Sequence, residues 1–153
     1  MPLDLRAAAP AALALRSAAS GDLVVPELHV ACTFFSRLVG LQFRRQLPAG
    51  QGLLLLPCAS IHTCFMRFAI DAVMLDGAGT VLRVVRNIRP WSGAFAPRGT
   101  RAVLELSPAP ATLAAGDQLR LVVRRDLPDR LMRRLSCLPT DHLAPSPTSK
   151  GAS

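Results

Sequence analysis

The chain has 153 residues, of which half are apolar, and its formal net charge is +8. An apolar fraction of this size can form a buried core, so the composition excludes fibrous proteins and chains that are disordered throughout. Only 18% of the residues are charged and the basic ones are almost all arginine, which indicates compositional bias rather than a basic binding surface. The length predicts one domain.

The N-terminal part of the chain is predicted to form a hairpin after a short arm. Residues 1–10 show no hydrophobic period and are predicted to be a flexible arm. A single β-rich domain is predicted over residues 11–125. At its start, the turn residues 20–22 separate the apolar segments 11–15 and 23–25, which is typical of two antiparallel strands.

A helix is predicted over residues 33–42. Thr33 suits the N-cap position because its side chain can accept a hydrogen bond from the first helical turn. The apolar residues that follow are spaced as one helical face, and they are Phe34, Phe35, Leu38 and Leu41. Gly40 lies inside this range and marks an alternative end for the helix.

Most of the remaining chain is predicted to form strands. Short apolar or alternating segments predict strands at residues 53–56, 70–75, 80–88, 102–106 and 119–123. The fold class is therefore mainly β, a small antiparallel β-barrel-like or sandwich-like domain with one principal helix. Residues 126–138 predict a short basic amphipathic helix, and the Pro-, Ser- and Thr-rich residues 139–153 predict a disordered tail.

Residues 57–71 hold the densest group of reactive side chains. In an extended strand His62, Cys64 and Met66 would lie on one face, with Cys58 close by. Imidazole and thiolate groups suit Zn or Cu(I), so Cys58, His62 and Cys64 are candidate metal ligands. We favour the alternative that the sulfur-containing residues fill the core, and we expect no metal and no cofactor. His62 is also a candidate general base.

Two carboxylates lie in predicted strands. Asp71 shares a strand face with apolar residues, so we expect loop amides or an arginine such as Arg67 to hold its charge. Asp71 is also the candidate catalytic partner of His62. For Glu105, in the middle of a strand, we favour a position on the solvent face of a sheet.

The sequence predicts few partners. Trp91 is the only large ring near basic residues, the chain has no tyrosine, and no nucleic-acid motif occurs, so we expect no specific nucleic-acid partner. No apolar run can cross a membrane as one helix. The N-terminus makes a poor signal peptide, so we expect reduced cysteines and a cytoplasmic monomer whose partner is a small molecule or a protein.

Several motifs occur in an order that resembles a known family. They are FFSRLVGL at 34–41, GLLLLPC at 52–58, IHTCFMRFAID at 61–71, VLEL at 103–106 and Gly-Asp at 116–117. From about residue 23 to residue 123 the sequence resembles the bacterial family catalogued as domain of unknown function 192. The resemblance implies a compact, mostly antiparallel β fold with one helix, and it carries no established activity or cofactor.

The resemblance also ranks the candidate residues. Members of the family usually have a proline where this chain has Ala69, and another branch carries Trp-Met-Lys where His62 and Thr63 stand here. The histidine is therefore not needed for a chemistry common to all members, whereas an aspartate at position 71 fits both branches. The resemblance therefore favours Gly40, Asp71, Glu105 and Asp117 as the candidate functional positions.

From these features we predict a non-enzymatic binding or accessory module. The alternative is a small hydrolase-like or metal-dependent enzyme that uses His62 and Asp71. An enzyme should have a concave pocket where these two side chains meet a third polar group, whereas an adaptor should expose an apolar or basic patch. The candidate binding residues are His62, Thr63, Met66, Asp71, Glu105 and Trp91.

Overall fold

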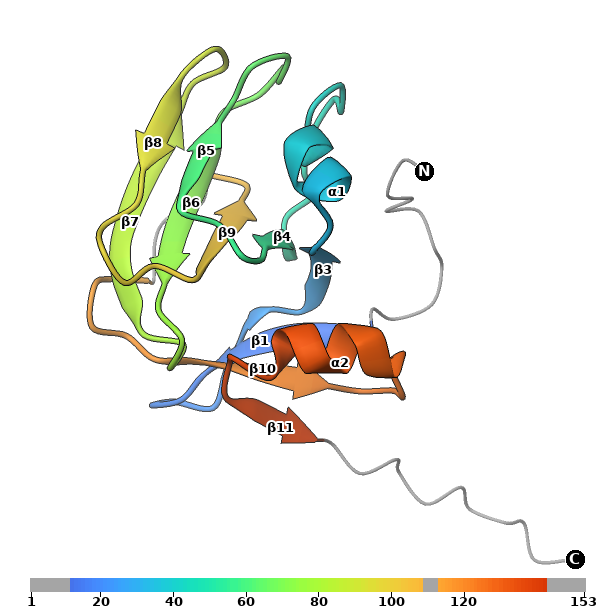
Figure 1. Ribbon diagram of the computed structural model, residues 1–153. Helices are drawn as coiled ribbons and strands as arrows, with labels where there is room; N and C mark the ends of the chain where they lie inside the picture. The colour runs from blue at the N-terminus through green and yellow to red at the C-terminus, as the bar shows by residue number, and fades with distance from the viewer. Residues whose placement is uncertain (1–11, 109–112, 143–153) are drawn as a thin grey trace, which may run out of the picture.

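Strands dominate the computed structural model, which describes residues 12–108 and 113–142 (Figure 1). The strands are β1 (Leu13–Ser17), β2 (Leu23–Val25), β3 (Glu27–Ala31), β4 (Gln51–Leu55), β5 (Ser60–His62), β6 (Ile70–Leu75), β7 (Val81–Ile88), β8 (Gly93–Phe95), β9 (Ala102–Leu106), β10 (Leu119–Val123) and β11 (Thr140–His142). The helices are α1 (Phe34–Val39) and α2 (Asp129–Leu135). The predicted mainly β class is confirmed.

The strands form three sheets. The central five-stranded sheet has the order β3-β4-β9-β6-β7, a four-stranded sheet has the order β11-β10-β1-β2, and β5 pairs with β8. Two of the described pairs, β3–β4 and β10–β11, run parallel, whereas the other described pairs are antiparallel. The arrangement is therefore mostly antiparallel, and the described strands do not close into a barrel.

Strands β4, β6 and β9 are buried on both faces of the central sheet. Successive side chains of a strand point to opposite faces, so each of these strands contributes to two cores. On one face, Leu54 and Leu104 belong to a core that also contains residues of β1, β10 and α2, here called the α2-side core. On the other face, Leu53 and Val103 pack in a second core with Ile61 of β5, here called the α1-side core. Figure 1 shows the four-stranded sheet and α2 at the lower end and α1 beside the upper part.

Helix α1 begins as the sequence predicts and ends earlier. The Thr33 hydroxyl accepts a hydrogen bond from the backbone N–H of Ser36 at 3.1 Å, and the Ser36 hydroxyl accepts one from the Thr33 N–H at 3.0 Å. This reciprocal capping box confirms Thr33 as the N-cap. The helix ends before Gly40, whose φ of +45° takes the chain out of the helix. The Gly40 alternative is therefore the correct one.

The predicted N-terminal hairpin is present, and a second hairpin follows later in the chain. β1 and β2 pair antiparallel, as do β6 and β7, and β4 lies between β3 and β9 in the interior of its sheet. A bulge in β7 occurs opposite the start of β6, because Ile70 pairs with Ile88 whereas Ala72 pairs with Val85. This bulge places Asp71 opposite Arg86 and Asn87.

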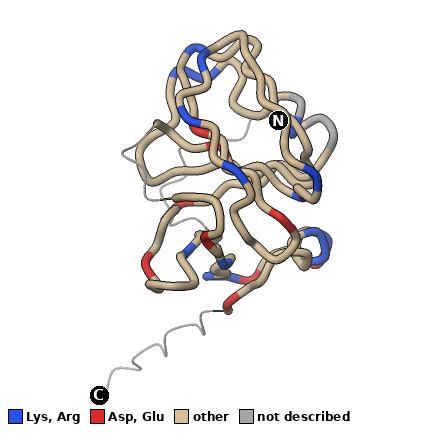
Figure 2. Tube along the Cα trace, turned by 90° about the vertical axis from the view of Figure 1, so that its left-hand side faces the viewer, with Lys and Arg blue, Asp and Glu red and all other residues tan. Residues whose placement is uncertain are grey.

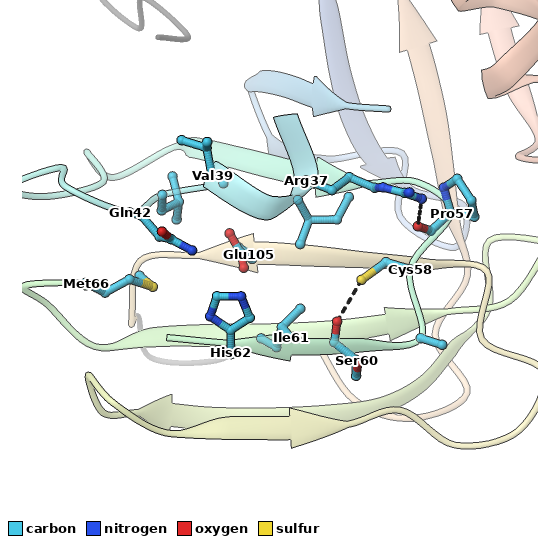
Figure 3. A pocket seen from close by; sticks show the side chains of 14 residues that line it. Arg37, Val39, Gln42, Pro57, Cys58, Ser60, Ile61, His62, Met66 and Glu105 are labelled. Atoms are coloured by element: carbon cyan, nitrogen blue, oxygen red, sulfur yellow. Dashed lines mark hydrogen bonds between the residues drawn. The ribbon is translucent and has the colours of Figure 1, made fainter. Parts of the chain in front are cut away.

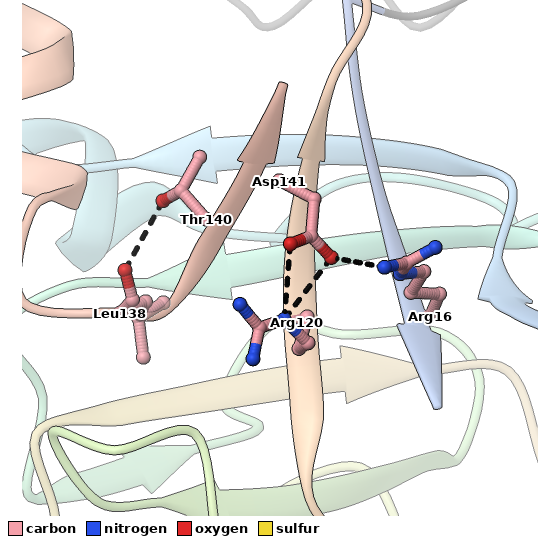
Figure 4. A network of polar contacts seen from close by, with 5 residues as sticks. All are labelled: Arg16, Arg120, Leu138, Thr140 and Asp141. Atoms are coloured by element: carbon pink, nitrogen blue, oxygen red, sulfur yellow. Dashed lines mark hydrogen bonds and ion pairs between the residues drawn. The ribbon is translucent and has the colours of Figure 1, made fainter. Parts of the chain in front are cut away.

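The prediction of disorder from residue 139 onward is wrong for residues 140–142. These residues form β11, which runs parallel to β10. Asp141 lies 2.6 Å from Nη2 of Arg16 and accepts hydrogen bonds from Nε of Arg120 at 3.1 Å, as Figure 4 shows. The hydrogen bond from Arg120 lowers the pKa of Asp141, and desolvation only partly opposes this. These contacts hold a segment whose own composition is typical of a tail.

Two predicted segments lie outside the described residues, namely the arm at 1–10 and residues 143–153 of the tail. The predicted basic helix at 126–138 corresponds to α2, in which Leu135 is fully buried in the α2-side core. Within the part of the chain that the structure describes, no helix is long and apolar enough to cross a membrane.

Candidate functional site

A pocket opens between α1 and β5, above the α1-side face of the central sheet (Figure 3). Its volume is about 380 Å³. The end of α1 and the residues after it form one wall, and the β4–β5 loop and β5 form the other. The lining residues are Arg37, Val39, Gly40, Leu41, Gln42, Leu55, Pro57, Cys58, Ala59, Ser60, Ile61, His62, Met66 and Glu105.

Glu105 supplies the polar group at the bottom of the pocket. On β9 it follows the alternation of Val103, so its side chain lies on the α1-side face of the sheet. The residue is 3% exposed. The expected solvent-facing position is therefore wrong, because β9 lies between β4 and β6 and both faces of this sheet are covered.

The Glu105 carboxyl has an oxygen without a partner. Among the described residues, no hydrogen bond is made to Oε2, although this atom is almost completely buried. Burial raises the pKa of Glu105 from its ordinary value of 4.5 to about 8. At neutral pH the group therefore keeps its proton, and the neutral carboxyl can both donate and accept a hydrogen bond.

Gly40 leaves the space beside this carboxyl open. A Cβ atom at position 40 would lie 3.9 Å from Oε2 of Glu105, in ordinary van der Waals contact. Because Gly40 also has a positive φ, a larger residue there would strain the backbone as well as narrow the pocket. Two of the four positions that the family resemblance favours, Gly40 and Glu105, thus meet at one place in the structure.

Cys58 and Arg37 lie on the rim of the pocket. The Cys58 thiol donates to the backbone oxygen of Ser60 at 3.0 Å, and burial raises the pKa of this thiol. A thiol with a raised pKa is a poor nucleophile at neutral pH. The Arg37 guanidinium donates to the backbone oxygen of Pro57 and so ties α1 to the β4–β5 loop.

His62 lines the pocket from β5 and remains exposed, and Met66 lines it while buried. Figure 3 shows the His62 ring pointing toward the space that the Glu105 carboxyl faces. The predicted common face of His62, Cys64 and Met66 is wrong, because β5 ends at His62 and Phe65 takes a φ of +61°. In residues 12–108 and 113–142, no group of three or more His, Cys, Asp or Glu side chains could hold a metal ion.

Thr63 has a structural position rather than a place in the pocket lining. Its side chain is fully buried, and its hydroxyl donates to the backbone oxygen of Arg89 at 2.6 Å. The same hydroxyl accepts a hydrogen bond from the backbone N–H of Ser92 at 2.9 Å. Thr63 therefore connects the β5–β6 loop to the β7–β8 loop.

Asp71 lies on the opposite side of the central sheet from the pocket. It alternates in phase with Val73, which faces the α2-side core, as the sequence predicts. Its Oδ1 accepts a hydrogen bond from the backbone N–H of Asn87 at 2.8 Å, and its Oδ2 pairs with Nη1 of Arg86 at 3.2 Å. The arginine that holds Asp71 is thus Arg86 and not the expected Arg67.

Trp91 is 66% exposed and forms part of a row of three rings. The ring centroids of Phe43 and Phe65 are 5.5 Å apart, and those of Phe65 and Trp91 are 4.8 Å apart. We call Phe43, Phe65 and Trp91 the aromatic ridge. Sequence reasoning identified only Trp91, because the two phenylalanines lie in different loops and no periodicity connects them.

Asp117 caps a turn. Its Oδ2 accepts a hydrogen bond from the backbone N–H of Ala114 at 2.9 Å, and Gly116 next to it has a φ of +97°. This Gly-Asp motif therefore has a local structural explanation.

The family model DUF192, described as Uncharacterized ACR, COG1430, matches residues 16–121. The chain belongs to the DUF192 family. The match includes all residues that line the pocket, whereas α2 and β11 lie beyond it. The resemblance stated from the motifs is thus confirmed.

Two crystal structures share the fold of this DUF192 chain. One is a protein of unknown function from Novosphingobium aromaticivorans DSM 12444, with a TM-score of 0.62 and 22% identity over 74% of this chain and 93% of that one. The other is a candidate transcription regulator from Sinorhizobium meliloti 1021, with a TM-score of 0.59 and 23% identity over 70% of this chain and 89% of that one. No curated protein matches the chain. At these identities the two crystal structures show the fold of this chain alone.

Proposed function

We propose that this DUF192 domain is a non-enzymatic binding module whose small-molecule ligand occupies the pocket above Glu105. One observation carries the proposal, namely that a buried carboxyl oxygen without a protein partner lies at the bottom of an open pocket. A buried polar atom that lacks a hydrogen bond costs about 1 to 3 kcal/mol. A ligand that supplies the missing hydrogen bond would recover this cost.

The chemistry of the pocket indicates what such a ligand needs. A protonated Glu105 offers one donor and one acceptor in a lining that combines apolar side chains such as Ile61 and Met66 with polar ones such as Gln42 and His62. Pockets for small molecules combine an apolar lining with a few polar groups in this way. We therefore expect an uncharged ligand of modest size that carries at least one hydrogen-bonding group.

A binding role is better supported than the alternative enzyme. That enzyme requires His62 and Asp71 in one site, but His62 lines the pocket whereas Asp71 lies across the central sheet. The Asp71 carboxylate is also engaged by Arg86 and by the backbone of Asn87. The Cys58 thiol, which also lines the pocket, has a raised pKa and is therefore a poor nucleophile at neutral pH.

A fragment screen by nuclear magnetic resonance tests the proposal. A library of small uncharged molecules is added to 15N-labelled protein, and the backbone amide signals of Gly40, Cys58 and His62 are followed. Hits are expected to shift these signals in the wild type and in Glu105→Gln, which keeps a donor and an acceptor. Binding should be lost in Glu105→Leu, which has a similar volume and no polar atom.

Asp71→Asn is the matched control, because it alters the other buried carboxylate on the opposite face of the same sheet. It should bind the same fragments with unchanged affinity. A library that moves none of the pocket signals would contradict the proposal, and so would hits that bind Glu105→Leu as well as the wild type.

A further inference from the structure

We propose that the aromatic ridge and the arginines beside it form a docking surface for anionic lipid membranes. This surface lies at the tips of three loops and requires no ligand in the Glu105 pocket. Phe43 is in the α1–β4 loop, Phe65 in the β5–β6 loop and Trp91 in the β7–β8 loop. Figure 1 shows these three loops at the upper end of the molecule, away from α2.

The ridge is an exposed apolar surface made by residues far apart in the sequence. Phe43 is 65% exposed, Phe65 is 51% exposed and Trp91 is 66% exposed. The Phe43 and Phe65 rings are stacked with an interplanar angle of 26°, and Phe65 meets Trp91 at 61°. Because the rings contact one another, they form one continuous patch rather than three separate side chains.

The backbone under the ridge is strained at all three positions. The φ angles are +63° at Phe43, +61° at Phe65 and +58° at Trp91. A bulky residue in this region costs energy that a glycine would not, and such strain clusters at functional sites. Glycine would stabilise the backbone at each position, yet the chain carries a large ring at all three. Exposed rings on strained backbone are typical of a surface that contacts a partner.

Hydrogen bonds between the loops hold the rings in place. The Phe43 N–H donates to the backbone oxygen of Phe65 at 3.2 Å, and the Trp91 N–H donates to the backbone oxygen of Thr63 at 3.0 Å. The buried Thr63 hydroxyl adds the contact to Arg89 described above. The ridge is therefore preorganised, so little conformational entropy is lost when it docks.

The charge around the ridge determines the kind of partner. The three loops, residues 40–50, 63–69 and 89–92, contain arginines and no Asp or Glu. Arg45, Arg67 and Arg89 are exposed, and none forms an ion pair with a described acidic residue. Figure 2 shows basic positions in the loops at the same upper end. This arrangement complements an anionic surface.

A membrane surface fits these features better than a nucleic acid does. Single-stranded nucleic acids stack successive bases on free ring faces, but here the Phe43 and Phe65 rings stack on each other. A lipid interface instead takes a continuous apolar patch into the headgroup region, with aromatic rings at that depth and arginines near the phosphates. A ridge with the exposed Arg45, Arg67 and Arg89 in the same three loops meets both requirements.

The test uses Trp91, which is the only tryptophan in the chain, as a built-in reporter. The full-length protein is titrated with vesicles of phosphatidylcholine alone and of phosphatidylcholine mixed with phosphatidylglycerol. We expect the Trp91 emission to move to shorter wavelength with the anionic vesicles only, and the shift to weaken as salt is added. Arg67→Gln should weaken binding about fivefold, since one arginine near an anionic surface contributes about 1 kcal/mol.

The variants separate the ridge from general charge attraction. Phe65→Gly removes a ring while relieving the positive φ, so it should keep its circular dichroism spectrum and lose most of the binding. Arg130→Gln on α2 and Phe95→Ala, whose side chain is 85% exposed outside the ridge, should bind within about twofold of the wild type.

Three results with vesicles would overturn the proposal. They are equal binding to neutral and anionic vesicles, no binding to either, and an effect of Arg130→Gln as large as that of Arg67→Gln. A single-stranded oligothymidylate that binds the ridge in preference to the anionic vesicles would assign the surface to nucleic acid instead and would also overturn it.

Discussion

Replacing Asp71 by alanine should lower the free energy of unfolding by about 2 to 4 kcal/mol. The Asp71 side chain is only 6% exposed, and its two oxygens hold two groups of β7 at a bulge. One of these groups is the N–H of Asn87, whose φ is +52°, and the other is the Arg86 guanidinium. The carboxylate therefore stabilises the positive-φ backbone at Asn87 and also pairs with the Arg86 guanidinium.

The magnitude follows from the two contacts. A hydrogen bond to a charged acceptor contributes about 1.5 to 3 kcal/mol, and the bond to Asn87 at 2.8 Å belongs in that range. The Arg86 side chain is 40% exposed, so solvent screens the ion pair to roughly 0.5 to 1 kcal/mol. Arg86 also donates to the backbone oxygen of Leu113 at 2.7 Å, which keeps it in place when Asp71 is removed.

Urea denaturation followed by circular dichroism measures the effect. Asp71→Asn keeps an acceptor for the Asn87 N–H and loses the charge, so it should cost about half as much as Asp71→Ala. His62→Ala, at an exposed position, should change stability by less than about 0.5 kcal/mol. If Asp71→Ala also unfolds within about 0.5 kcal/mol of the wild type, the carboxylate is not structural and a role in binding or catalysis becomes the leading hypothesis.

Three further outcomes are expected. The pKa of Glu105 is about 8 in the folded protein and near 4.5 in the unfolded chain. The free energy of unfolding should therefore fall as the pH rises from 4.5 to 8, by up to roughly 1.4 kcal/mol per pH unit relative to Glu105→Gln. Parallel stability curves for the two proteins would refute this. Deleting residues 139–153 should lower the melting temperature more than deleting 143–153, because only the longer deletion removes β11; equal effects would show that β11 contributes nothing. Protein purified without chelator should carry well under one equivalent of Zn or Cu by elemental analysis, whereas a full equivalent that disappears in Cys64→Ala would establish a metal site.

Sequence reasoning succeeded where the local structure depends on residues that are close in the sequence. The alternation in β6 is sufficient to place Asp71 on the face of Val73, and the Thr33 cap depends on Ser36 three residues later. In both cases the deciding contacts or periodicities lie within a few residues.

Sequence reasoning failed where the position of a residue depends on contacts with segments far away in the sequence. The burial of Glu105 depends on β4 and β6 flanking β9, and alternation alone cannot show that both faces of a sheet are covered. β11 depends on Asp141 meeting Arg16, which is more than one hundred residues away in the sequence. The aromatic ridge depends on positive φ angles at two phenylalanines and a tryptophan, which local preference disfavours and only contacts between loops can maintain.

The four-stranded sheet also sets the order of events during synthesis. β1 is made among the first residues of the domain, but its partner β10 is made about one hundred residues later, and β11 follows still later. Until β10 is synthesised, the edge of β1 in the β1–β2 hairpin has no partner strand. An unpaired strand edge favours pairing with other nascent chains. We expect the domain to complete folding only after β10 has left the exit tunnel, and chaperones that shield open edges to matter more for its yield than for the stability of the finished fold.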